Sequence, residues 1–276
     1  MLKNGFSELD RFPGNWISGQ LKYFVWQWPS YFGSVISLMR KRTGIRKTDT
    51  FLVSFPRSGN TWVRFILSHC HPGSSRDRNV IVDIDEVIPE SIMDETPSPR
   101  VIKTHSMYSP IFPRAIYLLR DGRDSTHSSY KLAGKRDGWD FSFMDFLQAH
   151  PGDLDEVEKK AAQWPCRWHQ HVRSWHTQTY VPMLVVRYED LKRDTLVEVK
   201  RMTSFLGWNV TEEQLVEAIE ASSIESMRKL ENSKKLQLNS VGQGIVGGAA
   251  QKYTTEEMEC FLTYAGKTLR EFGYLE

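Results

Sequence analysis

The chain has 276 residues, and its 36 lysines and arginines nearly balance its 34 aspartates and glutamates, leaving a formal net charge of +2. This near-neutral charge argues against a strongly basic nucleic-acid-binding surface, and we expect no nucleic-acid partner. Hydrophobic residues make up 40% of the chain and charged residues 25%, which is typical of a folded rather than a disordered protein. The three cysteines are scattered and odd in number, which argues against a disulfide framework and favours a reducing compartment, the cytoplasm.

The first 47 residues form an aromatic-rich segment that we separate from a single domain spanning residues 48–276. A basic run, residues 40–47, follows the aromatic residues. A membrane-spanning helix needs about 20 mostly apolar residues, whereas Lys22 and the helix-breaking Pro29 interrupt this stretch. Two interpretations follow: the segment packs on the domain beside a pocket, or residues 16–47 make a peripheral membrane contact through aromatic and basic side chains.

Beyond residue 48, strand-like and helix-like segments alternate. Short runs rich in β-branched and aromatic residues predict strands at residues 51–55, 101–103, 115–119 and 183–187. Helical periodicity predicts helices at residues 61–70, 125–132, 141–150, 158–177, 192–206, 211–221 and 254–272, the last two with a threonine capping pattern. The alternation predicts an α/β fold with a central, mainly parallel sheet flanked by helices. Ligands of such sheets bind beyond the carboxyl ends of the strands, so the segments after each strand hold the candidate site.

The turn after the first strand, PRSGNTW at residues 56–62, has the composition of an anion-binding site. The first N–H groups of a helix lack internal partners, and the helix dipole favours negative charge there. Gly59 lets the backbone approach a ligand closely, and Arg57 adds a guanidinium suited to phosphate or sulfate. No Lys-Ser/Thr pair follows a second glycine, so the turn differs from a nucleoside-triphosphate loop. On turn chemistry alone, a capped helix with a surface arginine is the simpler explanation.

Three further segments follow the later strands. Lys103-Thr104-His105 ends a strand-like run, and an imidazole with an unperturbed pKa of about 6.5 can take a proton at neutral pH. Residues 120–130, RDGRDSTHSSY, repeat the arrangement of turn, guanidinium, hydroxyl and helix start, and residues 188–191 read YEDL. Two phosphate-binding turns on adjacent strands suit a ligand phosphorylated at both ends. Taken singly, the three segments also fit a surface histidine, a polar turn with weak ion pairs and a core tyrosine.

In this order, FLVSFPRSGNTW (residues 51–62), KTH (103–105), RDGRD (120–124) and YEDL (188–191) resemble the sulfotransferase family that depends on 3′-phosphoadenosine 5′-phosphosulfate, PAPS. These enzymes transfer the sulfuryl group of PAPS to an acceptor and release the bisphosphate PAP. The resemblance covers roughly residues 51–272 and implies the P-loop-like sulfotransferase fold for the domain 48–276. The residues in these segments require no metal ion, and we expect none.

The resemblance assigns catalytic roles to three residues. It implies that His105 is the general base that takes the proton of the acceptor. It also implies that Arg57 and Lys103 neutralise the charge that develops on the leaving phosphate.

The residues implied to bind the donor come from five segments. They are Arg57, Ser58, Gly59, Asn60, Thr61, Trp62, Arg120, Ser128, Tyr188, Ser222, Ile224, Gly242, Gln243 and Gly244. The resemblance places Arg120 and Ser128 on the 3′-phosphate. It places Trp62 and Tyr188 beside the adenine, with Ser222 and Ile224 in a looser match.

The chain departs from the family at two places. The C-terminal loop of the family carries two basic residues where this chain has Gly242 and Gln243. Backbone amides of the glycine-rich residues 242–254 can still bind phosphate. Without the two basic residues, we expect weaker binding of the 3′-phosphate. The family usually has lysine in place of Arg57, and a guanidinium stabilises charge but is a worse proton donor.

We therefore predict a PAPS-dependent sulfotransferase that acts on a hydroxyl, or less readily an amine, of a small-molecule acceptor. Two other functions stay open here. One is a P-loop-type small-molecule kinase, which the missing Lys-Ser/Thr pair disfavours. The other is a non-catalytic protein that binds adenosine bisphosphate, which the altered C-terminal loop favours. No pattern in the sequence indicates an oligomeric state.

His169 and His171 lie near Cys166 and raise the question of a metal site. Residues two apart on a helix do not face the same way, so these histidines make a poor pair of ligands. We interpret the run instead as a helix with one buried face that holds Trp168, Val172 and Trp175.

Overall fold

The computed structural model of the chain describes residues 44–71, 81–83, 100–137, 142–148, 166–178, 180–232 and 246–276. Residues 1–43, which include most of the proposed membrane contact, lie outside this range, as do Gly242, Gln243 and Gly244. The helix expected at residues 158–177 is described only from residue 166 onward.

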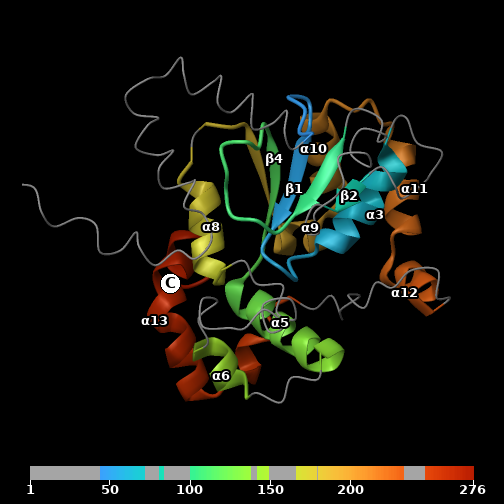
Figure 1. Cartoon of the computed structure of the whole chain (residues 1–276). Coiled ribbons are helices and arrows are strands. Elements are labelled where there is room, and N and C mark those ends of the chain that lie inside the picture. Colours follow the sequence, from blue (N-terminus) through green and yellow to red (C-terminus); the bar gives the residue numbers. More distant parts are fainter. Residues whose placement is uncertain are drawn as a thin grey trace, which may run out of the picture.

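A five-stranded sheet forms the centre of the described residues (Figure 1). Its strands are β1 (Thr50–Ser54), β2 (Ile81–Asp83), β3 (Val101–Thr104), β4 (Ala115–Leu119) and β5 (Met183–Arg187). Their order is β2-β3-β1-β4-β5, and every neighbouring pair is parallel. The predicted α/β fold with a parallel sheet is therefore confirmed. β2 is missing from the predicted strands because its three residues are too few for a periodic pattern.

Helices surround the sheet (Figure 1). One face packs against α3 (Asn60–Cys70), α9 (Tyr188–Arg193), α10 (Thr195–Leu206) and α11 (Glu212–Ala221). The other face packs against α8 (Trp168–His176) and α13 (Thr255–Glu271). Beyond the carboxyl ends of the strands lie α5 (Gly122–Asp137) and α6 (Phe143–Gln148). The other described helices are α12 (Ile224–Asn232) and the short 3-10 helix Ala250–Lys252.

The strands are buried on both faces because successive side chains of a strand point to opposite sides. Phe51 and Val53 of β1 enter the core with α8 and α13, together with Tyr117 of β4. Leu52 points the other way, into the core beneath α3, α10 and α11, together with Ile116 of β4. This two-sided burial explains why these strands appear in the sequence as continuous apolar runs.

The helix boundaries show where local signals work and where they fail. Thr211 and Thr254 cap α11 and α13 with complete capping boxes, as predicted. The helix predicted at residues 192–206 is α10, which begins at Thr195, and its first two predicted residues belong to a separate helix, α9. They separate at Asp194, whose extended backbone ends α9 and whose side chain accepts a hydrogen bond from the first turn of α10.

A buried ion pair joins the starts of β1 and β3, at the end of the sheet opposite the predicted site. The guanidinium of Arg100 donates to both carboxylate oxygens of Asp49, at 2.9 and 2.5 Å, and both side chains are 0% exposed. Asp49 also accepts from the backbone N–H of Arg46 at 2.7 Å, and Arg100 donates to the carbonyl of Gly44 at 2.8 Å. The pair therefore ties the chain before β1 to the start of β3.

Asp49→Ala is expected to lower the free energy of unfolding by about 3–5 kcal/mol, because a buried guanidinium then loses its carboxylate. The matched control is the exposed ion pair of Lys200 and Glu212, whose charged atoms lie 3.3 Å apart. Lys200→Ala is expected to cost less than about 1 kcal/mol. Guanidinium chloride denaturation of both variants measures the difference, and equal losses would contradict it.

Candidate active site

Three adjacent strands, β3, β1 and β4, end side by side at the carboxyl edge of the sheet. The chain leaves β1 toward β2 and β3 on one side, and leaves β4 toward β5 on the other. Ligands of open parallel sheets bind where the strand order reverses in this way. The predicted site segments after β1, β3 and β4 all begin at this edge.

The turn after β1 presents backbone N–H groups at the start of α3. Gly59 caps α3 with a left-handed backbone, φ 94°, and Arg57 also has a positive φ of 67°. Left-handed residues next to a helix start turn successive N–H groups toward one side, which is the geometry of an anion-binding nest. The first turn of α3 contains no acidic residue that would repel an anion.

The turn after β4 uses a carboxylate as its cap. The backbone N–H of Arg123 donates to Asp121 at 2.9 Å, so α5 begins at Gly122, earlier than the predicted start at residue 125. A Cβ at Gly122 would lie 2.5 Å from the ring of Trp168, so a glycine is needed for this ring to pack beneath the turn. The indole N–H of Trp168 donates to the carbonyl of Arg120 at 3.1 Å and holds the turn in place.

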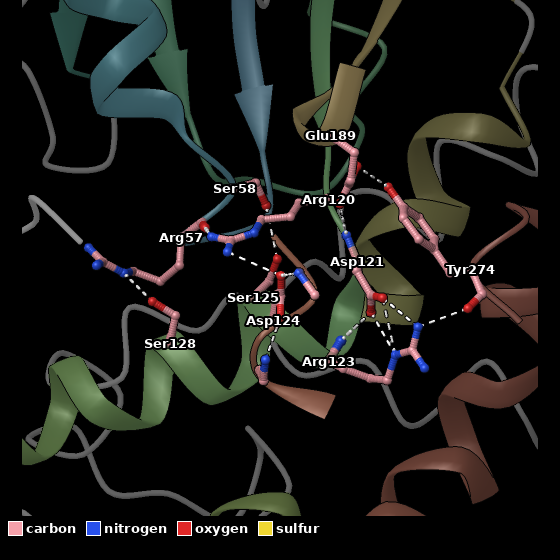
Figure 2. A network of polar contacts seen from close by, with 12 residues as sticks. Arg57, Ser58, Arg120, Asp121, Arg123, Asp124, Ser125, Ser128, Glu189 and Tyr274 are labelled. Carbon is pink, nitrogen blue, oxygen red and sulfur yellow. Dashed lines mark hydrogen bonds and ion pairs between the residues drawn. The ribbon is translucent and has the colours of Figure 1, made fainter. Parts of the chain in front are cut away.

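Figure 2 shows how the two turns are joined. The guanidinium of Arg120 donates to the carbonyl oxygen of Arg57 at 2.8 Å. Nε of Arg57 donates to the hydroxyl of Ser128 on α5 at 3.0 Å, and the hydroxyls of Ser58 and Ser125 lie 3.4 Å apart. The two predicted anion-binding turns therefore follow adjacent strands and touch. Arg57 and Ser128, which the resemblance assigns to different phosphates, contact each other directly.

Asp124 connects the β4 turn to the C-terminal glycine-rich segment. Its carboxylate accepts from the backbone N–H groups of Gly247 at 2.8 Å and Ala249 at 2.9 Å. The guanidinium of Arg120 lies 3.3 Å from the same carboxylate, whose side chain is only 3% exposed. No local sequence pattern indicates this role for Asp124, because Gly247 lies 123 positions away along the chain.

His105 follows β3, and β1 holds its ring. Nδ1 of His105 lies 2.7 Å from the backbone carbonyl oxygen of Ser54 and 3.3 Å from the hydroxyl of the same residue. A carbonyl oxygen only accepts hydrogen bonds, so Nδ1 carries the proton and the neutral ring has its lone pair on Nε2. The side-chain amide of Asn60, the first residue of α3, donates to the Ser54 hydroxyl at 3.1 Å. Lys103, the third predicted catalytic residue, lies near the end of β3 and is 7% exposed.

His171 lies against the backbone of His105. It belongs to α8 and is 0% exposed, with Nε2 at 3.0 Å from the carbonyl oxygen of His105 and Nδ1 at 2.8 Å from the hydroxyl of Tyr117. Burial lowers the pKa of His171 to about 3, so its ring is neutral at neutral pH. The predicted buried face of this helix is confirmed and includes this histidine: Trp168, His171, Val172 and Trp175.

Tyr188 and Trp62 lie together beside the β1 turn. A Cβ at Gly59 would lie 2.7 Å from the ring of Tyr188. The rings of Trp62 and Tyr188 meet edge to face with centroids 6.4 Å apart, and the guanidinium of Arg120 lies 4.3 Å from the centroid of Tyr188. The sequence left Tyr188 open between a core residue and a pocket residue, and in the structure its ring packs on the predicted donor turn.

Ser222 and Ile224 lie at the junction of α11 and α12. Ser222 follows the last residue of α11, which packs against α3, and Ile224 begins α12. The side chain of Ser222 is 0% exposed, and its hydroxyl has no hydrogen-bond partner among the described residues. A buried polar group without a partner is unfavourable, so this hydroxyl is a candidate to bond with a ligand.

Within the described ranges, no group of three or more His, Cys, Asp or Glu side chains is arranged to hold a metal ion. His169 instead packs against the ring of Tyr264, with centroids 5.3 Å apart, and burial lowers the pKa of His169 to about 4. No helix in this part of the chain is long and apolar enough to cross a membrane.

A sequence model described as "Sulfotransferase domain" matches residues 47–260, which is well over half of the chain. The chain belongs to the PAPS-dependent sulfotransferase family. Mouse sulfotransferase 1B1 is 28% identical over 206 residues, which cover 66% of each protein, about two thirds of its length. Mouse sulfotransferase 2A1 is 25% identical over 261 residues, which cover 84% of this chain and 88% of that protein. The predicted family and enzyme class are confirmed.

Solved structures show that this sulfotransferase also has the fold of its family. Mouse sulfotransferase SULT7A1, complexed with PAP, has a TM-score of 0.63 at 21% identity and covers 82% of this chain and 89% of that one. Retinol dehydratase, in a complex with retinol and PAP, has a TM-score of 0.61 at 18% identity and covers 81% and 82%. The predicted P-loop-like sulfotransferase fold is therefore confirmed.

Gly59→Ala is expected to displace Tyr188 of this sulfotransferase, because the new Cβ would lie 2.7 Å from the ring at a φ of 94°. Gly207→Ala is the matched control, since Gly207 has a φ of 74° and no atom within 4 Å of a Cβ. Both variants carry the cost of a left-handed alanine, about 1–2 kcal/mol, so their difference reports the contact with Tyr188. Calorimetry should show weaker PAP binding by Gly59→Ala alone. Equal affinities of the two variants would refute a role for this contact.

The buried His171 should make the sulfotransferase less stable in acid. Its pKa falls from 6.5 in the unfolded chain to about 3 in the folded one, so below pH 6.5 the unfolded chain binds a proton that the folded chain does not. Its contribution to the free energy of unfolding therefore falls by up to about 1.4 kcal/mol for each pH unit between 6.5 and 3. His171→Gln should show a shallower slope in urea denaturation between pH 6.5 and 4.5. The expectation fails if the slopes are the same.

Proposed function

We propose that this sulfotransferase transfers the sulfuryl group of PAPS to a hydroxyl, or less readily an amine, of a small-molecule acceptor, with His105 as the general base. The observation that carries the proposal is the 2.7 Å contact between Nδ1 of His105 and the carbonyl oxygen of Ser54. This contact leaves the lone pair on Nε2. An acceptor hydroxyl is a poor nucleophile until a base takes its proton, and the other tautomer of His105 would present an N–H instead.

The proposed donor site spans the two joined turns. The N–H groups at the start of α3, with Ser58 and Thr61, are proposed to bind the 5′-phosphosulfate, and Arg120 and Ser128 the 3′-phosphate. The contacts between the turns support this assignment, because they join two helix starts that each have an arginine beside them. The nearby carboxylate of Asp124 is paired with Arg120, which limits its repulsion of a phosphate.

The adenine is proposed to lie against Trp62 and Tyr188, with Ser222 and Ile224 as neighbours. The edge-to-face contact of the two rings supports this placement, because an aromatic pair offers a flat surface to a base. The buried hydroxyl of Ser222, which lacks a partner in the described part of the chain, would gain one from the ligand.

PAPS supplies the sulfuryl group and, in the phosphate that leaves, a group able to carry negative charge. Lys103 and Arg57 are proposed to stabilise the charge that develops there, and loss of such a group typically costs on the order of 10²–10³ in rate. Arg57 suits this role because it belongs to the turn after β1 and its side chain reaches Ser128 on α5. Because its guanidinium stays protonated, Arg57 acts by charge rather than by donating a proton.

Gly242, Gln243 and Gly244 are proposed to approach the 3′-phosphate through their backbone amides, since this chain lacks the two basic residues of the family. The following residues support this proposal. Asp124 accepts hydrogen bonds from the backbone amides of Gly247 and Ala249. These bonds hold residues 247–249 near Arg120, which pairs with the same carboxylate.

Two observations support a small-molecule acceptor. The near-neutral charge of the chain gives no basis for binding a polyanionic acceptor. Retinol dehydratase, which shares the fold, holds retinol together with PAP in its solved structure. Membership of the sulfotransferase family argues against the kinase alternative. If the protein were non-catalytic, it would bind PAP but would not transfer a sulfuryl group to any acceptor. Action in the cytoplasm stays a prediction from the sequence.

His105→Ala is expected to lower kcat by about 10²–10⁴, because the acceptor proton then has no base. Transfer from ³⁵S-labelled PAPS to a panel of phenols and alcohols measures this rate. The shift in melting temperature on adding PAP should be unchanged, since His105 is not proposed to bind the nucleotide. At 100 times its dissociation constant, PAP should add about 2.7 kcal/mol to the free energy of unfolding.

His69→Ala is the matched control, because His69 lies in the last turn of α3, away from the predicted site, and its kcat should stay near wild type. A wild-type rate for His105→Ala would remove His105 from the mechanism. PAP binding by the wild-type protein without transfer to any acceptor would favour the non-catalytic alternative instead.

A further inference from the structure

Tyr117, His171 and the backbone of His105 form a chain of hydrogen bonds beneath the proposed base. The hydroxyl of Tyr117 lies 2.8 Å from Nδ1 of His171, and Nε2 of His171 lies 3.0 Å from the carbonyl oxygen of His105. Tyr117 lies in β4, His171 lies in α8, and His105 directly follows β3. Tyr117 and His171 are both 0% exposed, so water does not compete for these bonds.

The direction of this chain of bonds follows from the carbonyl at its end. A carbonyl oxygen only accepts, so Nε2 of His171 carries the proton. Burial lowers the pKa of His171 to about 3, so its ring is neutral and Nδ1 has a lone pair that accepts from the Tyr117 hydroxyl. Along this chain of bonds, the Tyr117 hydroxyl donates to Nδ1 of His171, and Nε2 of His171 donates to the carbonyl oxygen of His105.

Aromatic neighbours hold the His171 ring in this orientation. Phe55, which follows β1, meets it edge to face with centroids 6.0 Å apart, and the ring of Tyr117 lies 5.6 Å away. A close-packed environment of this kind gives a side chain little freedom to swing. The imidazole is thus fixed both by packing and by its two hydrogen bonds.

We propose that His171 and Tyr117 are positioning residues for sulfuryl transfer, which fix the carbonyl of His105 and so set the place of its imidazole. Ser54 holds the ring of His105 through Nδ1, and His171 holds the peptide group from which the side chain extends. Both ends of the base are thereby anchored. The inference rests on the proposed role of His105 as the base.

Loss of the backbone anchor is expected to slow transfer without weakening donor binding. Misplacement of a reacting group by about 1 Å can cost 10²-fold in rate. His171→Leu puts an apolar side chain in place of the buried imidazole and removes both hydrogen bonds. We therefore expect kcat to fall about 10²-fold. The KM for PAPS and the melting-temperature shift with PAP should stay at wild-type values, because neither residue is proposed to contact the nucleotide.

Conservative variants separate positioning from packing. His171→Gln can place an amide N–H near the position of Nε2, and it should recover most of the lost kcat. Tyr117→Phe removes only the hydroxyl, and it should lower kcat by about tenfold, as expected for the loss of one hydrogen bond. The packing control is Val172→Ala, because Val172 is the next residue of α8 and is also 0% exposed. It should lose stability while kcat stays near wild type.

A double variant tests whether His171 acts through the base. In a His105→Ala background, His171→Leu should cause no further loss of kcat, because there is no imidazole left to position. An equal loss in both backgrounds would assign His171 a purely structural role and overturn the proposal. A wild-type kcat for His171→Leu would also overturn the proposal. If His105→Ala still inactivated the enzyme, the role of His105 as the base would stand.

The outcome for His105→Ala alone keeps the two proposals distinguishable, since a wild-type rate there would remove the base itself. If His171→Leu fails to fold, Tyr117→Phe and His171→Gln carry the test. A wild-type kcat for Tyr117→Phe, or a kcat for His171→Gln as low as that of His105→Ala with an intact PAP shift, would then overturn the positioning role.

Discussion

The hydrogen bond from Arg120 to the carbonyl oxygen of Arg57 joins the two turns on which the rest of the site depends. Arg57 has a φ of 67°, and a non-glycine residue in that region costs roughly 1–3 kcal/mol unless its surroundings hold it. Arg120 holds the carbonyl of this residue, and Ser128 holds its side chain. This left-handed backbone precedes the N–H groups at the start of α3, which are proposed to bind the donor. Strain in the turn therefore shapes the proposed anion-binding site, which would need little reorganisation when a ligand arrives.

Arg120 donates to the turn after β1, and the buried carboxylates beside it, Asp121 and Asp124, have hydrogen-bond and ion-pair partners of their own. Asp124 pairs with Arg120 and binds the amides of residues 247 and 249, while Asp121 pairs with Arg123 at 2.6 Å (Figure 2). Arg123 also donates to the carbonyl oxygen of Tyr274 at 2.8 Å, 151 positions later in the chain. The C-terminal tail therefore supports the β4 turn. Asp121 and Asp124 can lie beside the proposed anion site because arginines balance their charge and backbone amides donate hydrogen bonds to Asp124.

Local patterns predicted four of the five strands and both turns, because the residues that form each strand or turn are neighbours in sequence. β4 and β5 have the predicted bounds, since AIYLL is an apolar run and MLVVR holds four apolar residues before Arg187. α9 was missed because Tyr188 starts a helix directly after β5, with no turn residue between them. Asp124 and His171 were missed as site residues because their partners lie 123 and 66 positions away. Periodicity placed the neighbours of His171 on a buried face, but it does not indicate what a buried imidazole contacts.

His105 and His171 show how one residue type takes two roles from its partners. In each ring a backbone carbonyl selects the protonated nitrogen, Nδ1 in His105 and Nε2 in His171. The other nitrogen of His171 accepts from Tyr117, so burial leaves no polar atom of that ring without a partner. The other nitrogen of His105 holds the lone pair proposed to take the acceptor's proton. Because a carbonyl can only accept, the backbone sets both tautomers, and the lone pair of His105 stays on Nε2 whenever its ring is neutral.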